Sequence, residues 1–228
     1  MSEMLRSHRH LALLITAVAG LTLQPLLQAK FVGVLIFEVL AYALLIAVFL
    51  AIFERHRDRK IALMIGLPGI AANLFAYFAH GTAQWAALVL FHSLSVIFMG
   101  YAVGIILRGV FRSRHIGAEQ ILGGVCGYLL AGVAWANLYL VIYFFRPDGF
   151  NVAPGLAMQL ETPESRRFLF NYFSFITLST VGYGDMSPLS PAACSAAWLE
   201  ALFGQFYMAV LIGQLIGMKL TQTAITKP

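Results

Sequence analysis

The chain has 228 residues, of which 60% are hydrophobic and 11% charged, and its formal net charge is +5. A soluble domain of this length could not bury so much apolar surface, so the composition excludes an ordinary soluble protein. Several apolar runs are long enough to cross about 30 Å of hydrocarbon. Because these runs are continuous rather than alternating, they predict helices. The sequence therefore predicts an all-α integral membrane protein.

The apolar runs predict six membrane-spanning helices. The first follows a polar, basic segment, residues 1–10, and contains Ala17-Val18-Ala19, which looks like a signal-peptide cleavage site. Its apolar character continues past that point, which favours a retained span over a cleaved signal peptide. The predicted spans are Leu11–Leu27, Phe31–Phe53, Ile61–Ala79, Trp85–Leu107, Ile116–Phe145 and Ala192–Met218.

The basic residues between the spans predict the orientation of the chain. Eleven of the fifteen Lys and Arg residues fall on the side that holds both chain ends, and four fall on the other. Since the richer side is cytoplasmic, we expect both termini in the cytoplasm, including residues 219–228. The net charge is then a topology signal, and we expect no nucleic-acid partner.

The first four spans, residues 11–107, form a unit with short connections. Its fourth helix has no Arg or Lys before Arg108, although charges that move in the membrane field couple voltage to opening. Glu38 and His92 each lie about 10 Å deep at 1.5 Å per residue. They are a candidate pair for sensing external pH; separate, internally satisfied polar residues are the alternative. Residues 108–119 predict an amphipathic connector at the inner membrane surface, with a solvated loop as the alternative.

The most informative stretch is Thr180-Val181-Gly182-Tyr183-Gly184-Asp185. Its glycines reach positive φ at little cost. A surface turn is the alternative, but the stretch stands between an aromatic amphipathic run and a long apolar helix, which favours a functional loop. Thr162-Pro163 and Ser190-Pro191 predict helix starts on either side, each with a capping hydroxyl and a proline at the first position.

The stretch resembles the T-V-G-Y-G selectivity filter of potassium channels. The resemblance implies that backbone carbonyls of Thr180, Val181, Gly182 and Tyr183 bind K⁺ in a ring of four chains. It also implies that Val181 and Tyr183 pack the loop from behind. The pore domain is then residues 120–218, with an outer helix, a pore helix at 163–179, the filter at 180–185 and an inner helix at 192–218. The dipole of the pore helix favours a cation at its C-terminal end.

The surroundings of the filter depart from the commonest form of that family. Tyr172 and Phe173 replace two adjacent tryptophans, and Phe173 cannot donate a hydrogen bond to Tyr183. Ile176 stands where some bacterial members carry a glutamate, so Asp185 lacks that partner. Filter support is therefore expected from Asp185, Tyr172, Phe173, Ile176, Thr177 and Glu200, with Glu200 as a candidate partner for Thr177.

The inner helix supplies the candidate cavity and gate. Alignment on the filter places Gly204 at the family's glycine hinge and Gln205 in the cavity below the filter. Met208, Ile212 and Ile216 then face the ion path, where a hydrophobic constriction can gate by dewetting. Simple helix packing is the alternative for these apolar residues. Gly123, Gly124, Gly127 and Gly132 predict close packing of the fifth span, with the sixth as candidate partner.

The sequence thus predicts a homotetrameric, potassium-selective channel in a prokaryotic plasma membrane, without intrinsic voltage gating. We expect no enzymatic activity and no cofactor, with K⁺ as the permeant ion. The expected partners are identical subunits and membrane lipids. Gating is expected to depend on the membrane part, on lipid or on another protein. The alternatives are a weakly selective cation channel and a non-conducting regulatory subunit of a potassium transport system.

Overall fold

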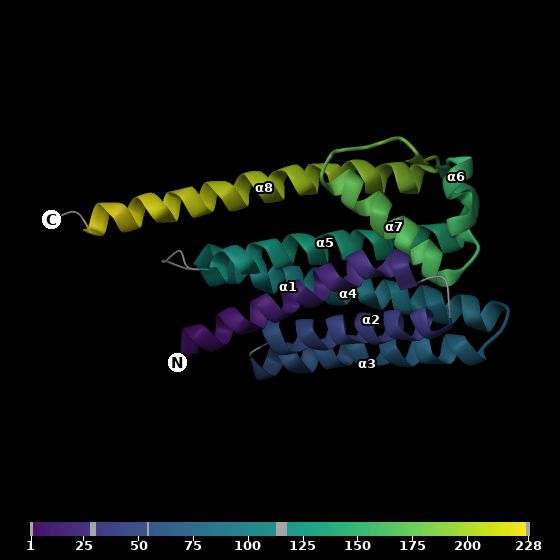
Figure 1. Cartoon of the computed structure of the whole chain (residues 1–228), viewed down its shortest axis with the longest axis horizontal. Helices are drawn as coiled ribbons and strands as arrows, with labels where there is room; N and C mark the ends of the chain where they lie inside the picture. The colour runs from purple at the N-terminus through teal and green to yellow at the C-terminus, as the bar shows by residue number, and fades with distance from the viewer. Residues whose placement is uncertain (1, 28–30, 54, 113–117, 227–228) are drawn as a thin grey trace.

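The protein is an array of long helices that run side by side, as a computed structural model shows (Figure 1). Its structure is described for residues 2–27, 31–53, 55–112 and 118–226, with side chains for residues 10–23, 39, 42–50, 52–53, 55–112, 120–214 and 216. The elements are α1 (Ser2–Leu27), α2 (Phe31–Ile52), α3 (His56–Phe78), α4 (Thr82–Arg112), α5 (Ala118–Phe145), η1 (Pro147–Gly149), β1 (Phe150–Val152), α6 (Pro154–Ala157), η2 (Met158–Leu160), α7 (Pro163–Leu178), β2 (Met186–Pro188) and α8 (Pro191–Thr226). The first turn of α1 and the last turn of α8 lie at the end opposite to α6 (Figure 1).

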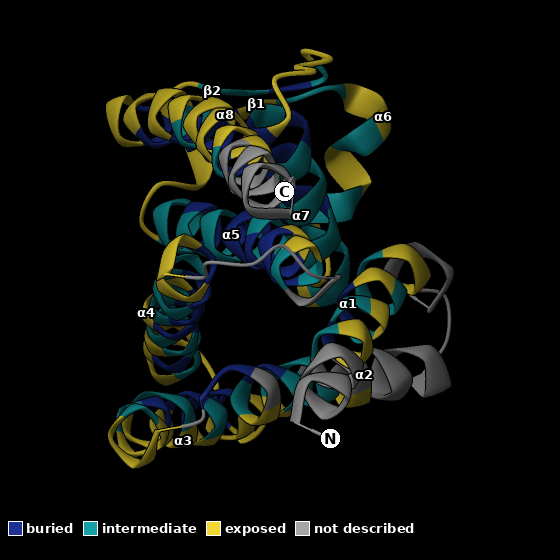
Figure 2. Cartoon of the chain, turned by 90° about the vertical axis from the view of Figure 1, so that its left-hand side faces the viewer, coloured by how far each residue is buried: buried dark blue, intermediate teal, exposed yellow. Residues whose placement is uncertain are grey.

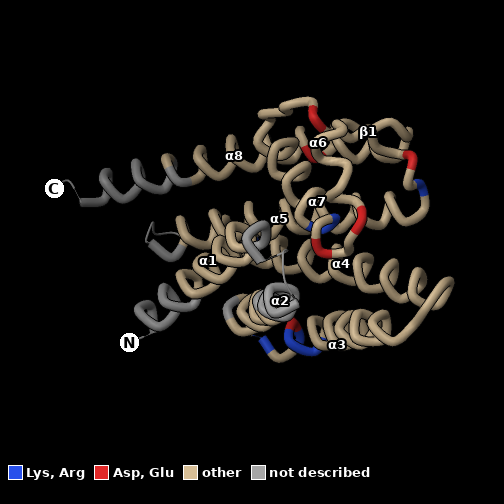
Figure 3. Tube along the Cα trace, turned by 45° about the vertical axis from the view of Figure 1, so that its right-hand side comes forward, with Lys and Arg blue, Asp and Glu red and all other residues tan. Residues whose placement is uncertain are grey.

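Four described helical stretches are long and apolar enough to cross a membrane: His56–Phe78, Thr82–Arg112, Gln120–Phe145 and Pro191–Gln214. Charged residues gather at the start of α3 and in the segments around α6 and α7, whereas the body of α3 lacks them (Figure 3). The chain is therefore a helical integral membrane protein, as predicted. Much of α2 lies outside the described side chains, so the number of six spans stays a prediction.

The longest helix contact joins α4 and α5, which pack along each other. Val103, Ile106 and Val110 repeat at helical spacing on the buried face of α4 and share a core with Cys126 and Leu130 of α5. Because Val110 continues that face, α4 runs on through Arg108 to Arg112. The sequence predicted an amphipathic connector at 108–119; residues 108–112 continue α4 as a helix, and residues 113–117 lie outside the described residues, so its place at the membrane surface stays a prediction.

The first four helices share a core with the rest of the chain. Helix α1 packs along α5, α4 packs along α5 elsewhere, and α3 packs on α4 (Figure 2). Leu13 of α1, Phe98 of α4 and Tyr207 of α8 are buried in one hydrophobic cluster. The amide of Asn73 on α3 donates a hydrogen bond of 2.8 Å to the hydroxyl of Tyr42 on α2. The helices before residue 107 and those after residue 120 therefore pack against each other, although the sequence divides the chain into two units there.

A two-stranded sheet joins the segment after α5 to the segment after residues 180–185, the filter-like stretch of the sequence, which is called the filter stretch below. Strands β1 and β2 pair antiparallel, with Asn151 opposite Ser187. The N–H of Ala153 extends the pairing by donating to the carbonyl of Asp185 at 2.8 Å. The sequence predicted only an outer loop here, because three-residue strands are too short to show a periodic pattern. The sheet fixes where the chain leaves the filter stretch.

Candidate functional site

Both predicted helix starts around the filter stretch are confirmed. The hydroxyl of Thr162 accepts a hydrogen bond of 3.2 Å from the N–H of Ser165, and Pro163 begins α7. The hydroxyl of Ser190 accepts one of 3.2 Å from the N–H of Ala193 at the start of α8. These caps satisfy backbone donors that the first helical turn leaves open. They fix where the chain enters α7 and where it enters α8.

The filter stretch has alternating backbone geometry. The φ angles of Thr180, Gly182 and Gly184 are +59°, +55° and +80°. Val181 and Tyr183, between them, do not have positive φ. Glycine adopts this region freely, whereas a β-branched residue there costs on the order of 1–3 kcal/mol. Thr180 therefore carries backbone strain, which clusters at functional sites.

The filter backbone is tied to the end of α7 on one side. The N–H groups of Val181 and Gly182 both donate to the carbonyl of Ile176, at 2.9 and 3.2 Å. In a trans peptide unit the N–H and the C=O point in opposite directions. The carbonyls in the same two units, those of Thr180 and Val181, must therefore point away from α7. Consecutive carbonyls on one side are the ligand arrangement that a dehydrated cation requires.

The side chains of Val181 and Tyr183 are open within the single chain. They are 52% and 71% exposed, so this chain alone does not cover them, and the expected packing behind the loop stays a prediction. The reason is geometric: the N–H groups, not the side chains, occupy the side that faces Ile176. Any cover for these two side chains must come from outside the chain.

Asp185 at the end of the filter stretch has a partner that the sequence did not reveal. The hydroxyl of Tyr172 donates a hydrogen bond of 2.5 Å to Oδ2 of Asp185. Ile176 is buried, and its backbone carbonyl accepts from the N–H groups of Val181 and Gly182 rather than contacting Asp185. Phe173 is also buried and packs against Tyr139 and Phe150, away from the filter. Tyr172 thus takes over the role of holding Asp185.

Glu200 of α8 is fully buried in a polar cluster between three helices. The hydroxyl of Tyr139 on α5 lies 2.5 Å from Oε2, and the hydroxyl of Ser174 on α7 lies 2.5 Å from Oε1. The partner on α7 is therefore Ser174, and not Thr177 as predicted, because Ser174 stands one turn nearer the start of α7. Glu200 thus links α8 to α7, the helix that leads into residues 180–185.

Gly204 of α8 allows a close approach to the end of α7. A Cβ atom at this position would collide with the carbonyl oxygen of Leu178. Gly204 is buried, and α8 is helical on both sides of it. The predicted hinge position is therefore a packing site in this structure. The predicted close packing of α5 on α8 is confirmed at Gly124 and Gly127, whose Cβ atoms would meet Leu211 and Tyr207.

The predicted cavity residues share an open face of α8. Gln205 is exposed, and Met208, Ile212 and Ile216 are 43%, 47% and 55% exposed. At about 100° per residue, Gln205, Met208, Ile212 and Ile216 stand about 100°, 40°, 80° and 120° around the helix from Gly204, all on the same side of it. The packing face and the candidate pore face are thus different faces of α8. Their role in conduction stays a prediction.

His92 has a partner within the chain, whereas the predicted pair with Glu38 stays untested. Nδ1 of His92 lies 2.7 Å from Oδ1 of Asn137 on α5. Its ring also stacks on Phe144 with a centroid distance of 5.8 Å. The side chain of Glu38 lies outside the described residues. The histidine is therefore a buried link between α4 and α5.

Residues 128–219 match a protein-family model described as an ion channel. The match includes most of α5, all of α7, the filter stretch and most of α8. It supports an ion-channel family for this part of the chain, and it agrees with a transport role rather than an enzymatic one. No curated protein and no solved structure matches the chain.

Proposed function

We propose that the chain is the subunit of a homotetrameric channel that conducts K⁺ passively through residues 180–184. One observation carries the proposal: the N–H groups of Val181 and Gly182 converge on the carbonyl of Ile176, so the carbonyls of Thr180 and Val181 face the opposite side. Carbonyls arranged in this way replace the hydration shell of K⁺ when four loops surround it. The permeant ion is the cargo of the protein and not a resident cofactor.

A tetramer follows from the mechanism, because one loop cannot surround an ion. The exposed side chains of Val181 and Tyr183 support it, since a neighbouring subunit would cover them. The open face of α8, with Met208 and Ile212, is available for the central cavity that such an assembly encloses. Helix α4, where a voltage sensor would carry its charges, has no Arg or Lys between Thr82 and Arg108.

A weakly selective cation channel is the second candidate. It is favoured by Phe173, which packs into the core and cannot brace Tyr183 with a hydrogen bond. A filter without that brace holds its carbonyls less firmly. A non-conducting regulatory subunit is the third candidate, but no contact in the described structure favours it.

The test is ion flux from proteoliposomes that contain the purified chain alone. We expect K⁺ to permeate at least tenfold faster than Na⁺, which corresponds to about 1.4 kcal/mol of discrimination. Gly182→Ala should abolish selective flux, because the position needs φ of +55°. Gly109→Ala is the matched control, since a Cβ there meets nothing within 4 Å and the φ is not positive.

Equal flux of K⁺ and Na⁺ would replace the proposal with the weakly selective channel. Assembled tetramers without any flux would point instead to the regulatory subunit.

A further inference from the structure

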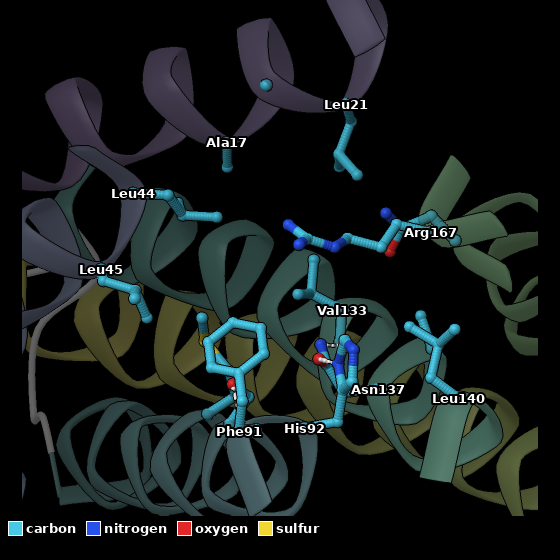
Figure 4. Close-up of a pocket in the computed structure, with 15 residues that line it drawn as sticks. Ala17, Leu21, Leu44, Leu45, Phe91, His92, Val133, Asn137, Leu140 and Arg167 are labelled. Carbon is cyan, nitrogen blue, oxygen red and sulfur yellow. Dashed lines mark hydrogen bonds between the residues drawn. The ribbon is translucent and has the colours of Figure 1, made fainter. Parts of the chain in front are cut away.

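A cavity of approximately 100 Å³ lies between the first helices and the pore domain of the same chain. Helix α1 forms one side, α4 and α5 form the opposite side, and α2 and α7 contribute from the two ends (Figure 4). Most of the wall is apolar. The apolar lining includes Ala17, Leu21, Leu44, Leu45, Val133 and Leu140.

One charged side chain enters this cavity among the described residues that line it. The guanidinium of Arg167 extends from α7 into the space below α1 (Figure 4). Its Cζ atom lies 5.8 Å from the ring centroid of Phe91 on α4, a cation–π contact that holds it there. The cavity therefore combines an apolar wall with a positive charge at one end.

The neighbouring arginine makes a useful comparison because it is engaged elsewhere. Nε and Nη2 of Arg166 donate to the carbonyl of Leu160, at 3.1 and 2.7 Å. Its Cζ atom also lies 5.0 Å from the ring centroid of Tyr143. Arg166 does not line the cavity. Arg166 therefore contacts Leu160 and Tyr143, whereas Arg167 is the one of the two arginines that lines the cavity.

The charge lies at one end of the cavity, and an apolar lining lies at the other. Arg167 enters from α7, whereas Leu44 and Leu45 of α2 line the opposite end (Figure 4). Nδ1 of His92 lies 2.7 Å from Oδ1 of Asn137, so these two polar side chains of the lining are hydrogen-bonded to each other. The charge and the apolar end are therefore separated, as the headgroup and the acyl chain of a lipid are.

We propose that this cavity binds part of one acyl chain of an anionic phospholipid whose phosphate is held by Arg167. A guanidinium has five N–H donors in a planar fork that suits phosphate oxygens, so it can bind them beside its contacts within the chain. The volume is of the order of an apolar cavity of about 150 Å³ that accepts benzene. It therefore holds a few methylene groups, while the rest of the lipid stays in the bilayer.

The test is lipid retention by the purified full chain, measured by native mass spectrometry after exchange into detergent with equal amounts of phosphatidylglycerol and phosphatidylcholine. We expect one phosphatidylglycerol retained per subunit, in preference to phosphatidylcholine. Arg167→Gln should lower phosphatidylglycerol retention about tenfold. Arg166→Gln, on the same helix but outside the cavity, should leave it unchanged. This readout does not depend on conduction, so it can fail while the proposed channel function stands.

A second variant keeps the test decisive if Arg167→Gln does not fold. Ala17 is 2% exposed and lines the cavity, so Ala17→Leu fills the space with the positive charge intact and should also lower retention. The proposal is overturned by equal retention of both lipids, by unchanged retention in Arg167→Gln or Ala17→Leu, or by equal losses in Arg166→Gln and Arg167→Gln. Retention of added free fatty acid in place of phosphatidylglycerol would also overturn it.

Discussion

At the scale of single residues, the end of the filter stretch depends on one side-chain hydrogen bond. Tyr172 donates to Oδ2 of Asp185, whereas Oδ1 is buried and has no partner in the described chain. A carboxylate in such a place is costly unless its bonds are made. The N–H of Ala153 holds the carbonyl of Asp185 from the other side. Tyr172 is therefore the side chain on which the position of the Asp185 carboxylate depends.

Tyr172→Phe removes that bond and leaves the ring. We expect a loss of about 1.5–3 kcal/mol in the free energy of unfolding, the range for a hydrogen bond to a charged group, seen as a lower thermal stability of the purified protein. If the proposed K⁺ conduction holds, open times in low K⁺ should also shorten. Tyr172→Trp restores a donor through its indole N–H and should recover part of the loss. An unchanged Tyr172→Phe protein would show that Asp185 is held by other contacts.

At the scale of elements, three helices meet at the buried carboxyl group of Glu200. The hydroxyl of Ser174 lies 2.7 Å from the carbonyl of Gly132 on α5 and 2.5 Å from Oε1 of Glu200. A hydroxyl has one hydrogen, so Ser174 cannot donate to both. If the hydroxyl of Ser174 donates its hydrogen to the carbonyl of Gly132, its contact with Oε1 of Glu200 is a hydrogen bond only when the carboxyl group of Glu200 is protonated and donates to Ser174. Hydrogen-bond counting thus favours a neutral Glu200 that donates to Ser174 and accepts from Tyr139.

A neutral Glu200 has a close mimic in glutamine, whose amide donates to Ser174 and whose oxygen accepts from Tyr139. We expect Glu200→Gln to keep the thermal stability of the assembly. Glu200→Ala should lower the free energy of unfolding by about 1–3 kcal/mol, the cost of leaving buried hydroxyls unpaired. Calorimetry or thermal scanning in detergent compares the three proteins. Equal damage by Gln and Ala would contradict the neutral form.

The same elements show what the sequence can and cannot predict. The starts of α7 and α8 were predictable, because Thr162-Pro163 and Ser190-Pro191 are local capping signals. The partners of Glu200 and Asp185 were not predictable from the residues alone, because they depend on how α5, α7 and α8 pack. The surroundings of Tyr183 are not settled by packing within the chain either, because its side chain is 71% exposed there.

At the scale of the whole molecule, the first four helices and the pore domain share one core. Leu13, Val48 and Phe98 lie in the same hydrophobic cluster as Leu130 and Tyr207. Helices α1 and α4 therefore contact α5 directly in the same chain, and α4 continues as a helix to Arg112.

Helix α4 offers few charges on which a transmembrane electric field could act. Helix α4 has no Arg or Lys between Thr82 and Arg108. One elementary charge that crosses the membrane contributes about 2.3 kcal/mol per 100 mV, which changes an equilibrium about fifty-fold. We therefore expect the open probability of the purified channel in planar bilayers to change far less than fifty-fold between −50 and +50 mV in symmetrical K⁺. A steeper dependence would require at least one whole charge to move across the field, and mutation of the remaining membrane-embedded ionisable residues, Glu38 first, would then locate it.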